Sequence, residues 1–200
     1  MRKHLCSVAG MGVLLLAGCN SPKDANKSIF KAALQQWFDA NPVCAPLTQD
    51  QDLPIERAKD DSRNKAALDA AVAAGLLSIE TMRSGPVGPP AAGNLTYRPT
   101  ATGKGTFRQR NHFLGGVDIC FARRRIETIE SFTEPADMLG VRATRVTFTY
   151  TLKDIAPWAT QPALAAALPA IGQILANPSQ TDAVGLVLTN EGWKDEHAPH

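Results

Sequence analysis

The sequence predicts an α+β fold, in which two N-terminal helices precede a mainly antiparallel sheet and a later helix packs on one face of that sheet. Three observations predict it. Apolar residues within 29–38 recur at helical spacings, residues 145–152 alternate between apolar and polar, and apolar residues within 164–175 return to helical spacing. With 200 residues, of which 44% are hydrophobic, we expect one globular domain. No hydrophobic run reaches the roughly 20 residues of a membrane-spanning helix, so multi-span membrane proteins are excluded.

The first helix is expected from Ser21-Pro22 to the residue before Asn41-Pro42. Serine can cap a helix, proline suits its first position, and the residue before a proline is disfavoured in a helix. The apolar stripe consists of Ile29, Phe30, Ala33, Leu34, Trp37 and Phe38. Residues 42–61 are polar and proline-containing, and we interpret them as a loop.

A second helix is expected to begin near Ser62 and to end at Gly75, a residue suited to helix termination. Residues 77–82 then alternate as a short strand. Residues 83–94 are rich in glycine and proline and predict a connection to a strand signal at 95–100.

Two longer strands follow. The first begins at 117–122, and its apolar pattern extends to Phe132. In the second, Val146, Phe148, Tyr150 and Leu152 alternate with arginine and threonine, as expected of a sheet that is packed on one face only. The polar connection at 133–137 would join the two strands into a long hairpin.

The later helix covers 161–175, and Pro169 should kink or split it. A last strand is expected at 185–189, followed by a turn at 190–192. The polar residues from about 193 onward predict a frayed tail.

The first eighteen residues have the form of a secretory signal: Arg2 and Lys3, then a short apolar stretch, then small residues. The stretch ends in Leu16-Ala17-Gly18-Cys19, which resembles the lipobox of bacterial lipoproteins. The resemblance implies cleavage before Cys19 and attachment of acyl chains such as palmitate to it. The alternative is an ordinary cleaved signal in which Cys19 has no special role. We expect residues 1–18 to be removed and 19–200 to form the mature protein.

The lipobox resemblance also implies a location. Two or more acyl chains attach a protein stably to a bilayer, so the mature protein would be anchored without spanning the membrane. In Gram-negative lipoproteins an aspartate after the cysteine favours the inner membrane, and Asn20 therefore favours the outer membrane, facing the periplasm. Loss of Arg2 and Lys3 lowers Lys plus Arg from 21 to 19, which equals the 19 Asp plus Glu. The mature chain is formally neutral, and we expect no nucleic-acid partner.

Two cysteines remain for pairing. Cys6 leaves with the signal and Cys19 is used for lipid, so Cys44 and Cys120 are expected to form a disulfide in the oxidising envelope. Two separate buried thiols are the alternative.

Two weaker resemblances concern the body of the chain. The order helix, strand, loop and Tyr-x-x-Thr-x-x-Gly-Lys within 65–107 loosely resembles the end of winged-helix domains, and is taken as an indication of shape only. The segments Tyr-Thr-x-Lys-Asp-x-x-x-Trp at 150–158 and Leu-Val-Leu-Thr-Asn-Glu-Gly-Trp at 186–193 resemble uncharacterised proteobacterial lipoproteins, which implies no activity.

The candidates for catalysis and metal binding are few. His112 is the one histidine in the body of the mature chain, and no Gly-x-Ser-x-Gly, Cys-x-x-Cys or His-Glu-x-x-His motif occurs. The remaining candidates are Glu127, Glu130 and Glu134 as paired carboxylates, the acidic tail with His197 and His200 as a weak metal site, and Gly103-Lys104-Gly105-Thr106 as a phosphate loop. For each of these a surface or turn role is the simpler interpretation, and we expect no cofactor, no metal and no catalytic residue.

One part of the sequence carries an excess of basic residues. This basic patch is densest at Arg123, Arg124 and Arg125, and it includes Arg142 and Arg145 further along the chain. Such a patch could bind an anionic glycolipid or an acidic envelope protein. Alternation along a strand would send Arg124 to the face opposite Arg123 and Arg125, so solubilising charge on an edge strand is the competing interpretation.

We therefore expect a lipid-anchored, non-enzymatic binding or structural protein of the bacterial cell envelope. A periplasmic hydrolase of cell-wall or lipid substrates is one alternative. An inhibitor or immunity lipoprotein that blocks a toxin is another.

Overall fold

The computed structural model describes residues 21–81, 94–110, 115–138 and 140–198. The expected signal segment 1–18 and the expected lipidation site Cys19 lie outside the described residues. Strands make up 43% of the described chain, which is mostly β.

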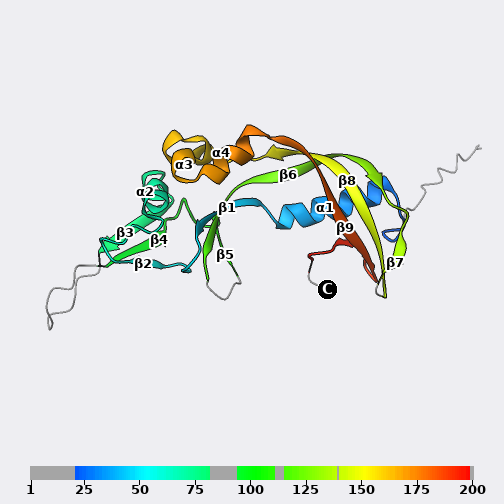
Figure 1. Ribbon diagram of the computed structural model, residues 1–200, viewed down its shortest axis with the longest axis horizontal. Helices are drawn as coiled ribbons and strands as arrows, with labels where there is room; N and C mark the ends of the chain where they lie inside the picture. Colours follow the sequence, from blue (N-terminus) through cyan, green and yellow to red (C-terminus); the bar gives the residue numbers. More distant parts are fainter. Residues whose placement is uncertain (1–20, 82–93, 111–114, 139, 199–200) are drawn as a thin grey trace, which may run out of the picture.

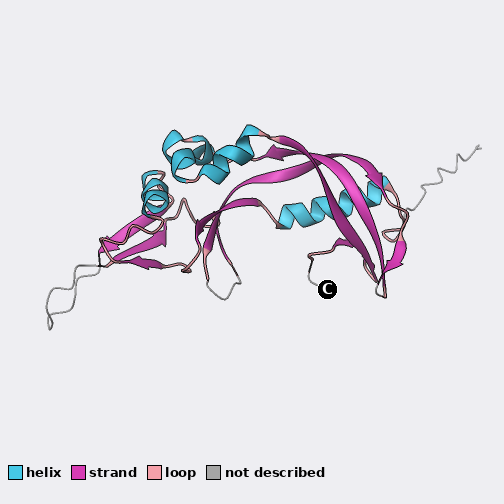
Figure 2. Cartoon of the chain, viewed as in Figure 1, coloured by secondary structure: helices cyan, strands magenta, loops and turns pink. Residues whose placement is uncertain are grey.

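A seven-stranded antiparallel sheet forms most of the fold (Figures 1 and 2). Its main path runs β1-β6-β8-β9-β10, while β5 pairs with β6 and β7 pairs with β8. The strands are β1 (Val43–Thr48), β5 (Phe107–Gln109), β6 (Val117–Phe132), β7 (Ala136–Met138), β8 (Val141–Lys153), β9 (Ser179–Thr189) and β10 (Gly192–Asp195). The sheet curls around helix α1 (Lys27–Ala40), which contacts β6 on one side and β10 on the other.

A smaller sheet lies at one end of the elongated molecule, and the large sheet with α1 forms the other end (Figure 1). It has the order β2-β4-β3 and consists of β2 (Ile55–Arg57), β3 (Leu77–Thr81) and β4 (Leu95–Pro99). Four short helices accompany it or lie between the two sheets: α2 (Lys65–Ala73), the 3-10 helix η1 (Pro157–Thr160), α3 (Pro162–Ala167) and α4 (Pro169–Ala176). The predicted break at Pro169 is confirmed, since α3 and α4 meet there.

Helix α1 supplies the main contact with the large sheet. Asn26 caps it, because its side-chain oxygen accepts a hydrogen bond from the Ile29 amide at 3.0 Å, and the last helical residue is Ala40. The helix therefore begins after the expected start at Ser21-Pro22, because Asn26 provides the cap instead of Ser21. Phe30, Leu34 and Phe38 form its buried face at spacings of four residues. In the core, the Phe30 ring meets the rings of Phe132 and Trp193 edge-on, at centroid distances of 4.9 and 5.2 Å.

The predicted long hairpin of the two central strands is confirmed. β6 and β8 pair antiparallel, and Val146, Phe148, Tyr150 and Leu152 of β8 are all buried. The threonines between them are half-buried on the other face. The Gln35 side chain of α1 fixes the helix to this sheet, since it donates to the Arg124 carbonyl at 3.0 Å and accepts from the Ile126 amide at 2.9 Å.

The predicted fold class is wrong. The chain is mostly β, and the two N-terminal helices do not form the expected unit, because α1 packs on β6 and β10 while α2 packs on α3 and β3. The winged-helix-like interpretation fails for the same reason. Helical periodicity shows that a helix has an apolar face, but not which part of the chain covers that face.

The predicted pairing of Cys44 with Cys120 is confirmed. The two residues lie directly opposite each other on β1 and β6, and their sulfur atoms are 2.06 Å apart. β1 occupies part of the segment that the sequence predicted as a loop. The disulfide therefore links the start of the large sheet to its longest strand.

Candidate functional site

A concave feature with an aromatic wall lies between α1 and β10. It is a groove of about 230 Å³, and one wall is the C-terminal half of α1 while the other is β10 and the residues that follow it. The lining residues are Ala33, Gln36, Trp37, Ala40, Trp193, Lys194, Asp195 and Ala198. We call this the α1–β10 groove.

The β10 wall of the groove is fixed by strand pairing. Trp193 and Asp195 alternate with Lys194, so both point toward α1 and are 5% and 2% exposed. The indole Nε1 of Trp193 donates to the Lys23 carbonyl at 3.2 Å, and the Asp195 carboxylate accepts from the His197 amide at 2.9 Å. The sequence predicted a frayed tail here. The structure differs because Trp193 fills the core beside Phe30.

Next to the groove, one edge of β9 is left open. β8 pairs with β9 from Ser179 to Val187, whereas β10 pairs only with Leu186–Thr189. One further backbone hydrogen bond to β9 follows the end of β10, where the Glu196 amide donates to the Gly185 carbonyl at 3.1 Å. Among the described residues, no strand pairs with the outer edge of 179–184.

The direction of the backbone groups along this edge follows from antiparallel geometry. The N–H and C=O of one residue point to the same side, and successive residues alternate. The Gly185 carbonyl points outward, where it accepts from the Glu196 amide, and the Pro178 carbonyl points inward, where it accepts from the Leu152 amide of β8. The backbone groups of Ser179, Thr181 and Ala183 therefore point outward. The Ala183 amide donates to the Asp182 side chain at 2.7 Å. We call Ser179–Val184 the open β9 edge.

The open edge and the groove together can accept an additional strand. A strand in line with β10 would hydrogen-bond with the outward groups of β9, and its alternate side chains would face the α1 side of the groove. Asp182 and Glu196 are exposed at this edge, whereas Asp195 is buried and contacts His197. Lys194 pairs with Glu191, so the two exposed carboxylates favour a basic residue in the incoming strand.

The predicted basic patch is divided by the structure. Arg123 and Arg125 are exposed on β6, opposite Lys153 and Thr151 of β8. Arg124 points instead toward α1, where its guanidinium lies 5.0 Å from the ring centroid of Phe38 and 5.5 Å from that of Tyr150.

The other two arginines of the patch lie at the far end of β8. Arg142 and Arg145 are exposed near its first residue. Six residue steps separate Arg145 from Thr151, which is about 20 Å along a strand. The five arginines therefore do not form one surface.

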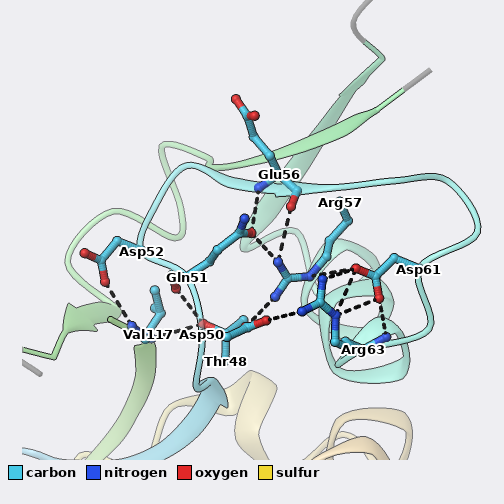
Figure 3. A network of polar contacts seen from close by, with 10 residues as sticks. Thr48, Asp50, Gln51, Asp52, Glu56, Arg57, Asp61, Arg63 and Val117 are labelled. Carbon is cyan, nitrogen blue, oxygen red and sulfur yellow. Dashed lines mark hydrogen bonds and ion pairs between the residues drawn. The ribbon is translucent and has the colours of Figure 1, made fainter. Parts of the chain in front are cut away.

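A network of charged residues joins the two sheets (Figure 3). The Arg57 side chain on β2 is almost fully buried; it pairs with Asp50 at 2.6 Å and also contacts Gln51. Arg63 bridges Asp50 and Asp61 at 3.0 and 2.7 Å. The hydrogen bond from Arg63 lowers the pKa of Asp61 to about 2. Because its members bind one another, we assign this network a structural role.

The same loop is tied to β6. The Val117 amide donates to the Thr48 hydroxyl at 3.1 Å, and the Gly116 amide donates to the Asp52 carboxylate at 3.0 Å (Figure 3). These bonds hold the entry of β6 beside the end of β1.

Glu127 and Glu130 are placed differently from the expectation for a regular strand. The sequence predicts opposite faces, but their side chains accept hydrogen bonds from Thr151 and Thr149, which share one face of β8. A register shift between Ile126 and Thr128 explains the change, because a bulge adds one residue to β6. Both glutamates are exposed and lie outside the groove.

The remaining candidates are dispersed. His112 and His200 lie outside the described residues. The His197 ring contacts Asp195 at 3.0 Å, and Glu134 is exposed between β6 and β7. Gly105 has a φ of 86°, as a tight turn requires.

No protein-family model matches the chain, and neither a curated protein nor a solved structure matches it. In the part of the chain that the structure describes, no group of three or more histidine, cysteine or acidic residues could hold a metal ion. Within the same residues, no helix is long and apolar enough to cross a membrane.

Proposed function

We propose that this protein is a lipid-anchored component of the bacterial cell envelope that binds an extended segment of another envelope protein. Acyl chains on Cys19 attach it to the outer membrane on the periplasmic side. The partner's segment adds as a strand to the open β9 edge and covers the α1–β10 groove. The partner contributes a basic residue near Asp182 and Glu196.

Two features support the proposed location. The lipobox-like Leu16-Ala17-Gly18-Cys19 supplies the lipidated cysteine. The disulfide between Cys44 and Cys120 fits an oxidising compartment such as the periplasm, because paired thiols persist there and are rare in the cytosol.

The observation that carries the binding proposal is the early end of β10. It leaves the outward backbone groups of Ser179 and Thr181, and the carbonyl of Ala183, beside a groove with an aromatic wall. Backbone hydrogen bonds along an edge supply affinity for an extended peptide, and pockets for alternate side chains supply specificity. Trp37 provides the large apolar contact on the α1 side.

Site-specific photocrosslinking tests this proposal. A photoreactive amino acid at Gln180 of the full lipidated chain, in intact envelopes, is expected to capture one envelope protein. Addition of Thr181→Pro should abolish the product, because proline removes the outward N–H of the central edge residue while edge strands tolerate it. Thr181→Val keeps this N–H and should preserve the product.

Three results would contradict the binding proposal. One is a product that survives Thr181→Pro, and another is a product that forms equally well from a photoreactive residue at exposed Thr128 on β6. Capture of a second copy of the chain alone would replace the proposed partner with self-association.

A further inference from the structure

An apolar hairpin tip lies at one end of the large sheet. Four large hydrophobic side chains of the described residues are strongly exposed: Ile79, Met138, Val141 and Ile155. Met138 and Val141 are the two most exposed, at 60% and 47%, and they are paired across the β7–β8 hairpin. Exposed apolar residues that lie together at a tip indicate a contact surface.

The hairpin tip lies at the end of the molecule where the N-terminal segment enters the fold (Figure 1). β8 begins there, and its Ala143 pairs with Val187 near the end of β9. The turn that follows β9 leads to Gly192, which lies directly against Pro22: a Cβ at Gly192 would be 2.9 Å from the Pro22 carbonyl oxygen. Strand pairing and this contact therefore bring the tip and the N-terminal entry to one end of the sheet.

The short chain between Cys19 and Ser21 limits how far this end of the fold can lie from a bilayer that holds the acyl chains. Two residue steps separate Cys19 from Ser21. Two extended residues reach about 7 Å, so a bilayer that holds the acyl chains of Cys19 must lie close to this end of the fold.

We infer that the β7–β8 hairpin tip is a second membrane contact, in which Met138 and Val141 enter the boundary between headgroups and acyl chains of an anionic bilayer. The inference rests on the proposed lipid anchor at Cys19. Apolar side chains at an interface are buried by about 5–10 Å, which suits a hairpin tip.

Two positively charged side chains close to the hairpin tip favour contact with an anionic bilayer. Arg142 follows Val141 directly, and Arg145 lies on the same face of β8 as Val141, about 13 Å further along the strand. Both side chains are exposed, and cationic side chains near a bilayer are attracted to anionic headgroups. Asp137, which lies opposite Arg142, is the acid nearest in sequence to the tip.

Depth-dependent fluorescence quenching tests the inference on the full lipidated chain. We would introduce Met138→Trp and, in a matched control, Ile79→Trp on the small sheet at the opposite end. Each variant is reconstituted into vesicles of phosphatidylethanolamine and phosphatidylglycerol with brominated acyl chains. Native tryptophans contribute equally to both variants, so the difference reports the introduced residue.

The expected result is co-sedimentation of both variants with the vesicles and at least twofold stronger quenching of Met138→Trp than of Ile79→Trp. Addition of Arg142→Gln and Arg145→Gln should reduce that difference. Co-sedimentation with equal quenching would overturn the hairpin contact and leave the lipid anchor intact. Failure of both variants to sediment would overturn the anchor, and the hairpin contact with it.

Discussion

Phe30→Ala is expected to lower the free energy of unfolding by about 3–5 kcal/mol, the usual cost of removing a buried phenylalanine side chain. Phe30 is fully buried, and its ring joins α1 to both β6 and β10 through Phe132 and Trp193. A typical domain has only about 5–15 kcal/mol to lose, so the variant should be close to unfolding at 37 °C. Urea unfolding of the chain from Asn20 to His200 measures the change.

Two controls separate loss of packing from a change in helix propensity. Phe30→Leu keeps most of the buried volume and should cost less than half as much. Ser28→Ala changes an exposed residue of the same helix and should stay within about 0.5 kcal/mol of the wild type. Equal midpoints for Phe30→Ala and Ser28→Ala would show that α1 does not hold the sheet in the way described.

Removal of the disulfide is the second large effect. The double variant Cys44→Ala, Cys120→Ala is expected to lose about 4 kcal/mol, because a bond between residues 76 positions apart constrains the unfolded chain strongly. Denaturant unfolding with and without dithiothreitol measures the effect. Dithiothreitol should destabilise the wild type by a similar amount and leave the double variant unchanged.

The state of the thiols provides a direct check on this prediction. In the native protein, neither Cys44 nor Cys120 should react with an alkylating reagent before reduction. Two reactive thiols in the native protein, together with a midpoint that dithiothreitol does not change, would contradict the account of the large sheet.

Local sequence patterns predicted several elements correctly. The alternation of Val146, Phe148, Tyr150 and Leu152 predicted both the strand and its buried face, because a period of two has a clear meaning for a sheet with one covered face. Pro42 and Pro169 marked a helix end and a helix break, since proline acts on the backbone wherever it occurs.

Features that depend on contacts between distant segments were not predictable in this way. The fold class was wrong because nothing local indicates that α1 is enclosed by β6 and β10 while α2 packs elsewhere. Trp193 was assigned to a tail because its partner Phe30 lies far away in sequence.

The candidate binding site was not predictable from the sequence for the same reason, because it depends on how distant segments pair. The open β9 edge exists because β10 stops at Asp195 while β9 begins at Ser179, and strand order is a property of the assembled sheet. Trp193 is the one large apolar residue within 192–195, because Lys194 and Asp195 are both charged. Four residues are too few to separate a short strand from a polar tail.

Metabolic labelling with a clickable fatty acid tests the central claim most directly. The account predicts that the wild-type chain incorporates the probe and fractionates with outer membranes, whereas Cys19→Ala incorporates none and leaves the membrane fraction. Cys6→Ala serves as the matched control and should label like the wild type. Equal labelling of the wild type and Cys19→Ala, or no labelling of either, would contradict the account.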